Sequence, residues 1–127
     1  MPEILEPSVK SLFLRIKSND HEISTGTGFI VTSATGHMLI TNRHIVTGRN
    51  NDTDELLSIK TGAVPDEIII SHNSKKGLGT WVEHCEPLYN NHKPLWHEYP
   101  TLGSQADFVA LPITQTEDVE FRSYDIY

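Results

Sequence analysis

His44 follows closely on a short apolar run at residues 38–41, and its side chain could do acid–base chemistry. An imidazole with an unperturbed pKa near roughly 6.5 can take a proton from a weakly nucleophilic hydroxyl and later return it to a leaving group. Such a base depends on a carboxylate at its other ring nitrogen, which holds the productive tautomer and stabilises the imidazolium. The sequence therefore indicates a general base at His44 that needs an orienting carboxylate.

Four aspartates further along the chain could orient His44. Asp52 and Asp54 stand in a run of Asn, Asp, Thr and Glu that is typical of a solvated loop, and Asp66 follows a proline in a turn-like context. Asp107 instead opens an apolar run at residues 108–111. Asp107 is the carboxylate we expect beside His44.

The elements that position these residues are expected to be β-strands, because short apolar runs alternate with Gly, Asn, Asp and Pro clusters. Residues 8–17 place Leu12, Leu14 and Ile16 on one face and Phe13 on the other, as in a half-buried strand. Further strands are expected at residues 26–33, 38–41, 56–60, 67–72, 80–85 and 107–113, with a helical turn at 44–48 and a packed loop at 87–100. No helix of crossover length intervenes, so the pattern favours an all-β barrel or sandwich.

Three segments occur in a distinctive order: Gly-Thr-Gly-Phe at residues 26–29, Thr-Asn-Arg-His at 41–44 and Asp-Phe-Val-Ala-Leu at 107–111. This order resembles the first half of a trypsin-like serine peptidase of the bacterial type, where G-[S/T]-G-F, T-x-x-H and D-x-[V/A]-x-L follow one another. The resemblance implies that residues 1–127 are the N-terminal half of the peptidase domain. It also implies a single antiparallel barrel of about six or seven strands, with one short helical turn after His44.

The resemblance also implies a catalytic role for both residues, with His44 as general base and Asp107 as its orienting carboxylate. The substrate would be a polypeptide, and a second barrel in cis would complete the site. His44 and Asp107 are 63 residues apart in the sequence, a longer separation than compact members of the family show. An insertion around residues 87–100 would account for it.

Gly26 and Gly28 fit a place where the backbone passes closely or adopts positive φ, with Phe29, Ile30 and Val31 filling the core behind them. A Gly-x-Gly can also belong to a dinucleotide-binding loop, but here it precedes β-branched residues instead of opening a helix. A dinucleotide-binding role is therefore not expected, and close approach and positive φ both stay open for these glycines.

The nucleophile of the family stands in a Gly-x-Ser-Gly motif, and the 127 residues contain none. Ser104 follows a glycine but precedes Gln105, and Ser123 lies in Arg-Ser-Tyr. We therefore expect the isolated chain to be inactive, and the nucleophile of the full-length protein could be Ser or Cys. Two alternatives stay open, a non-enzymatic single-barrel protein-binding module and a small β-protein unrelated to peptidases. A half-domain would expose its inter-barrel face, so a homodimer through that face is possible.

Composition limits the partners and the compartment. The formal charge of −7 argues against nucleic acid or an anionic membrane as the main partner. A single cysteine excludes an intrachain disulfide, so a reducing, cytoplasmic compartment is expected. The sequence shows no export signal and no apolar stretch long enough to cross a bilayer.

A second group of candidate residues, His84, Cys85, His92 and His97, has the side chains that zinc prefers. Adjacent residues on a strand point to opposite faces, so His84 and Cys85 cannot readily bind one ion. We expect no metal and no cofactor. Cys85 is also a poor candidate for the nucleophile. The nucleophile of the family that the chain resembles follows the aspartate, whereas Cys85 precedes Asp107.

Overall fold

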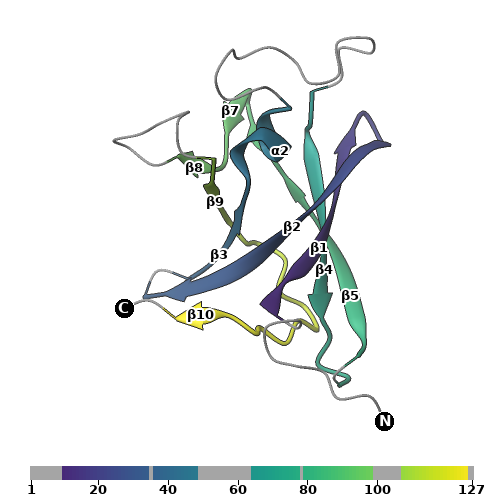
Figure 1. The fold of residues 1–127 in the computed structure, drawn as a ribbon, viewed down its shortest axis with the longest axis vertical. Coiled ribbons are helices and arrows are strands. Elements are labelled where there is room, and N and C mark those ends of the chain that lie inside the picture. The colour runs from purple at the N-terminus through teal and green to yellow at the C-terminus, as the bar shows by residue number, and fades with distance from the viewer. Residues whose placement is uncertain (1–9, 35, 49–63, 78, 99–106, 126–127) are drawn as a thin grey trace.

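The computed structural model describes residues 10–34, 36–48, 64–77, 79–98 and 107–125 (Figure 1). The elements in chain order are β1 (Leu12–Ser18), β2 (His21–Ser33), β3 (Gly36–Thr41), α2 (Arg43–Thr47), β4 (Glu67–Asn73), β5 (Trp81–Pro87), β6 (Tyr89–Asn90), β7 (Lys93–Pro94), β8 (His97–Glu98), β9 (Val109–Pro112) and β10 (Tyr124–Asp125). The chain is mostly β, as expected. No helix in the described ranges is long and apolar enough to span a membrane.

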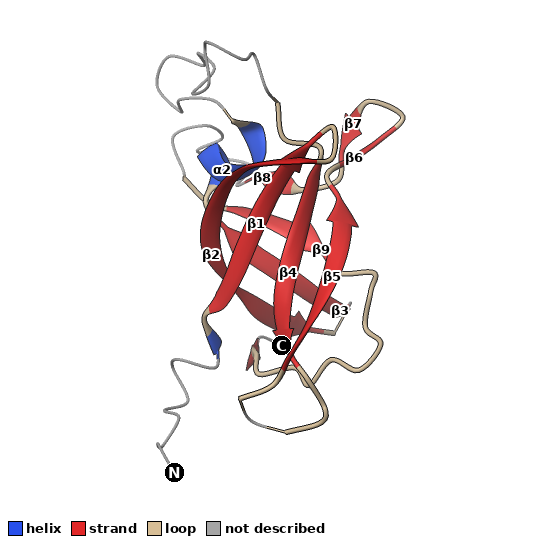
Figure 2. Ribbon diagram, turned by 90° about the vertical axis from the view of Figure 1, so that its right-hand side faces the viewer, coloured by secondary structure: helices blue, strands red, loops and turns tan. Residues whose placement is uncertain are grey.

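One large sheet contains most of the strands. Its order is β5-β4-β1-β2-β3-β9-β8, with every neighbouring pair antiparallel. β10 pairs with β2 in parallel, and β6 and β7 form a separate hairpin. Figure 2 shows the sheet strongly curled, so that β3 and β9 lie behind β1, β4 and β5.

The sheet does not close into the barrel that the sequence analysis expects. Within the described residues, β5 and β8 end the sheet and do not pair with each other. A buried side chain connects the two ends of the curl instead. The carboxylate of Glu86 on β5 accepts hydrogen bonds from the backbone N–H of Thr114 and Gln115, each at 2.9 Å, and from the Thr114 hydroxyl at 2.6 Å. The fold is therefore an open, curled sheet in which a buried carboxylate on β5 links that edge of the sheet to the segment after β9.

The core lies inside this curl. β1 alternates as the sequence predicts, with Leu12, Leu14 and Ile16 buried and Phe13 exposed. β2, β3, β4 and β9 contribute their inward residues, and Val46 of α2 and Trp96 complete the cluster. The buried apolar residues of the cluster are Leu12, Leu14, Ile16, Ile30, Leu39, Val46, Ile68, Ile70, Leu88, Trp96, Val109 and Leu111.

Most expected strands are present with shifted ends. The helical turn expected at residues 44–48 is α2, and the strand expected at residues 56–60 lies outside the described residues. The packed loop expected at residues 87–100 is wrong for its described part, which forms β6, β7 and β8. Asn91 and His92 both adopt positive φ, of 52° and 66°, which makes the tight turn that pairs β6 with β7. These strands of two residues are too short to show periodicity in the sequence.

Candidate active site

The His44 and Asp107 side chains meet at the ends of β3 and β9. The two Asp107 carboxylate oxygens accept from His44 Nδ1 at 2.9 and 2.8 Å, and Oδ1 also accepts from the His44 backbone N–H at 3.1 Å. Side-chain exposure is 42% for His44 and 39% for Asp107. The pair expected from the sequence is thus assembled, and it is open to solvent on one side.

The ring nitrogens of His44 have different environments. A carboxylate can only accept, so Nδ1 carries the proton that it donates to Asp107. No described residue makes a hydrogen bond to Nε2. In the neutral ring, Nε2 is therefore the basic nitrogen, with its lone pair available for a proton from a hydroxyl.

Asn42 is a further residue of the site that the sequence analysis missed. Its Nδ2 donates to the Asp107 carboxylate at 3.2 Å and to the Asp107 backbone carbonyl at 3.3 Å. Asn42 is also the N-cap residue of α2, yet its side chain makes no capping bond to the helix. Because the amide contacts both the main chain and the side chain of Asp107, it fixes where β9 begins relative to the turn that carries His44. The sequence feature that could have identified Asn42 is a side-chain amide two residues before the candidate histidine.

Two glycines allow the strand and helix to approach closely enough for this geometry. A Cβ on Gly28 would lie 2.7 Å from the backbone oxygen of Ile40 and 2.9 Å from Leu39 Cδ1. A Cβ on Gly26 would lie 2.5 Å from Cδ1 of Ile45, the residue after His44. The glycines of the Gly-x-Gly therefore bring β2 close to β3 and α2, and of the two alternatives that the sequence left open it is close approach, not positive φ, that the structure shows.

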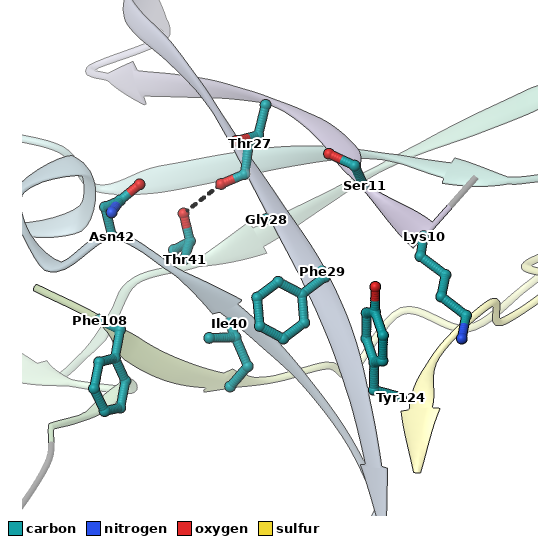
Figure 3. Close-up of a pocket in the computed structure, with 10 residues that line it drawn as sticks. All are labelled: Lys10, Ser11, Thr27, Gly28, Phe29, Ile40, Thr41, Asn42, Phe108 and Tyr124. Carbon is teal, nitrogen blue, oxygen red and sulfur yellow. Dashed lines mark hydrogen bonds between the residues drawn. The ribbon is translucent and has the colours of Figure 1, made fainter. Parts of the chain in front are cut away.

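The segment from Thr41 to Gly48, which carries His44, is held at both ends. Thr41 is buried, and its hydroxyl donates to the Thr27 carbonyl at 2.9 Å, which fastens the end of β3 to β2 (Figure 3). At the other end of α2, Gly48 adopts the left-handed conformation and its N–H donates to the His44 carbonyl at 2.9 Å. Arg43 forms an ion pair with Glu98 of β8, the strand beside β9. These contacts connect the short helix to both neighbouring parts of the sheet.

A groove of about 260 Å³ with a mixed polar and aromatic lining lies beside the pair, between β2, β3, β10 and the residues that precede β1 and β9 (Figure 3). Phe29, Phe108 and Tyr124 line it and are 38%, 45% and 46% exposed. The Phe29 and Tyr124 rings meet edge to face, with centroids 5.4 Å apart. Phe29 was expected in the core and this is wrong: β2 alternates, so Ile30 is buried and Phe29 points outward into the groove.

The other candidate acid and serine that the structure describes, Asp66 and Ser123, do not join this pair. Asp66 accepts from the backbone N–H of Asn19 at 2.9 Å, at the turn between β1 and β2. Ser123 accepts from the Thr32 hydroxyl at 2.7 Å. Asp52, Asp54 and Ser104 lie outside the described residues.

The second group of candidates is dispersed. His84 Nε2 donates to the Glu117 carbonyl at 2.7 Å, whereas Cys85 Sγ donates to the Glu67 carboxylate at 2.9 Å. His92 stands in the turn between β6 and β7, and His97 is on β8. Among the residues with described positions, no group of three or more His, Cys, Asp or Glu side chains could hold a metal ion.

Cys85 has the wrong electrostatics for a nucleophile. Partial burial and, next, its hydrogen bond to Glu67 raise the pKa of its thiol to about 11. The thiolate is the reactive form, so this environment suppresses reactivity at neutral pH.

Comparison of the chain with protein-family models, with curated proteins and with solved structures gives no match.

Proposed function

We propose that this chain is the His–Asp half of a trypsin-like serine endopeptidase, built on an open, curled antiparallel sheet. His44 is the general base that takes the proton of the nucleophile, and Asp107 orients it and stabilises the imidazolium. The observation that supports this most strongly is the engagement of Asp107 with both Nδ1 and the backbone N–H of His44, which leaves Nε2 for a hydroxyl. The order of the three sequence segments supports the same family.

The remaining parts of the site come from outside these residues. The 127 residues contain no Gly-x-Ser-Gly, so neither the nucleophile nor the backbone donors of an oxyanion hole is supplied. A second barrel in cis provides both in the full-length protein and packs on the face that carries the aromatic groove. The substrate is a polypeptide, and the single cysteine fits a reducing, cytoplasmic compartment.

A turnover assay tests this assignment. The 127-residue chain is expected to release nothing from casein or from an activated ester. A protein that continues beyond Tyr127 into a Gly-x-Ser-Gly is expected to hydrolyse both, and His44→Ala is expected to abolish the activity. His21→Ala is the matched control, because His21 is an exposed histidine at the start of β2. Turnover by the 127-residue chain that His44→Ala abolishes would contradict the proposed division of the site.

The second candidate is a non-enzymatic protein-binding module that has the same fold. The observation that favours it is the groove with three exposed aromatic side chains, Phe29, Phe108 and Tyr124, because exposed apolar patches mark interaction surfaces. The two candidates differ in the role of His44. A binding module loses partner affinity when Phe108 is replaced and is indifferent to His44→Gln, whereas the peptidase loses turnover with His44→Gln.

A further inference from the structure

Residues 114–125, here named the closing segment, run from the end of β9 to β10 along one end of the curled sheet (Figure 1). β5 holds its start through Glu86. β4 and its turn hold its middle, where the Glu120 N–H donates to the Asn73 carbonyl at 2.8 Å and the Lys75 N–H donates to the Asp118 carbonyl at 2.9 Å. Its last part is β10, which pairs with β2. The segment therefore bridges strands that are distant in the order of the sheet.

Three histidines from three different strands contact this segment. His84 of β5 donates to the Glu117 carbonyl. The His37 ring of β3 stacks on Phe121, with centroids 3.8 Å apart and planes 7° from parallel. The His72 ring of β4 meets Phe121 edge to face at 5.9 Å. Phe121 therefore contacts two imidazole rings, and a third imidazole bonds the backbone four residues before it.

His72 is the buried member of the group. It follows Ile68 and Ile70 on the inward face of β4 and is 1% exposed. Its Nε2 is buried and has no hydrogen-bond partner among the described residues. A proton on this ring would create an unpaired charge in an apolar site, which is strongly unfavourable.

The groups around His72 do not offset such a charge. The centroid of the His84 ring on β5 lies 5.9 Å from that of His72, and His84 repels a positive charge there, while the His37 ring stacks on Phe121. The acidic residues of the closing segment that lie near this contact, Glu117, Asp118 and Glu120, are exposed. Burial first, and then the repulsion from His84, lower the pKa of His72 to about 4.

We propose that the closing segment is a pH-sensitive clasp: protonation of the buried His72 releases residues 114–125 and withdraws Tyr124 from the groove beside His44 and Asp107. The connection to the groove is direct. Tyr124 belongs to the segment, pairs with Val31 through β10 and packs its ring against Phe29. The release depends only on the histidine cluster, whereas its effect on catalysis rests on the proposed function.

The direction of the pH effect follows from His72. In the docked state the ring stays neutral until about pH 4, but in the released state it takes a proton at its ordinary pKa of 6.5. Between these values the released state binds more protons, so docking weakens as the pH falls. Each pH unit changes the equilibrium about tenfold, so docking weakens up to about 300-fold across the interval.

Hydrogen exchange of the 127-residue chain tests the clasp. The Glu120 and Lys75 amides report docking, and the Ile70 amide of β4 reports the core. Between about pH 7 and about pH 4.5, after correction for intrinsic exchange, the protection of the two docking amides is expected to fall about 60-fold relative to that of Ile70. Unchanged relative protection at the lower pH overturns the proposal.

Two variants distinguish an effect of the histidines from a non-specific effect of low pH. His72→Leu replaces the imidazole with an apolar side chain of similar size and is expected to retain docking protection at the lower pH. His84→Gln keeps a donor for the Glu117 carbonyl but removes the neighbouring charge, which brings the pKa of docked His72 closer to its ordinary value, so the loss of docking protection at the lower pH is expected to be smaller than in wild type. His21→Gln, at the start of β2, is expected to behave as wild type. Equal loss of protection in wild type and His72→Leu overturns the clasp, and His84→Gln provides the second test if His72→Leu does not fold.

Failure of the clasp is distinguishable from failure of the proposed function. If a longer protein hydrolyses casein but the protection of its docking amides does not change with pH, the clasp is overturned and the peptidase assignment stands. If the chain releases its segment at low pH but a longer protein has no His44-dependent turnover, the peptidase assignment is overturned and the clasp stands.

Discussion

The Asp107 carboxylate holds His44 at two points, the ring Nδ1 at 2.8 Å and the backbone N–H at 3.1 Å. One side chain therefore fixes both the ring orientation and the start of α2. The amide of Asn42 in turn holds Asp107. This arrangement orients an imidazole for proton transfer within the described residues alone.

Replacement of Asp107 by Asn is expected to change the tautomer of His44. The side-chain oxygen of the asparagine would accept from the His44 backbone N–H, which turns its NH₂ group toward Nδ1 and moves the ring proton to Nε2. Nitrogen NMR of the ring measures the tautomer, and Asp66→Asn is the control. In an active longer protein the same change is expected to lower kcat by about four orders of magnitude. An unchanged Nδ1–H tautomer in Asp107→Asn argues against the orienting role.

Replacement of Gly28 by Ala is expected to destabilise the fold by about 1–3 kcal/mol, because the new Cβ meets a backbone oxygen that cannot move alone. Gly26→Ala is the matched comparison. Its Cβ meets the end of the flexible Ile45 side chain, so a loss of about 1 kcal/mol or less is expected. Urea denaturation of both variants measures the difference. Equal losses would show that backbone proximity at Gly28 is not the cause.

The alkylation rate of Cys85 is expected to be low and to rise with pH. With its pKa raised from 9.0 to about 11, the thiolate fraction near neutral pH falls about 100-fold relative to an unperturbed thiol. Iodoacetamide kinetics between about pH 7 and about pH 10 measure this. Glu67→Gln removes the carboxylate and is expected to increase the rate, and Glu22→Gln is an exposed control. Rapid alkylation at neutral pH would reopen Cys85 as a nucleophile.

The isolated chain is expected to form a homodimer through the aromatic groove, because the groove exposes apolar rings that a second barrel would cover. Light scattering over a range of concentrations measures the mass. Phe108→Ser is expected to shift the chain to monomer. Phe13→Ser is the control, since Phe13 is about as exposed but does not line this groove. A monomer at every concentration contradicts the expectation.

The sequence predicts the parts of this protein that local patterns determine. The alternation of Leu12, Leu14 and Ile16 identifies β1, and the apolar run after Asp107 identifies β9. The pairing of His44 with Asp107, 63 residues apart, was predictable only because the segments occur in a recognisable order.

Other features depend on contacts between distant residues and leave little local signal. β10 has two residues and forms because the closing segment is held by β4 and β5. The exposure of Phe29 follows from the alternation of β2, which the expectation of a buried run overlooked. The bond from Asn42 to Asp107 joins residues 65 apart, and the Glu86 tie replaces the expected barrel closure with side-chain bonds. Neither bond is visible in residue spacing.

Fluorophosphonate labelling of a protein that extends beyond Tyr127 tests the central claim most directly, because the reagent reacts with a serine that a histidine activates. The account predicts covalent labelling at a serine in a Gly-x-Ser-Gly, with loss of labelling in His44→Ala, strong reduction in Asp107→Asn and full labelling in the His21→Ala control. Labelling that persists in His44→Ala, or a Gly-x-Ser-Gly serine that is never labelled, would contradict the assignment of His44 as the general base.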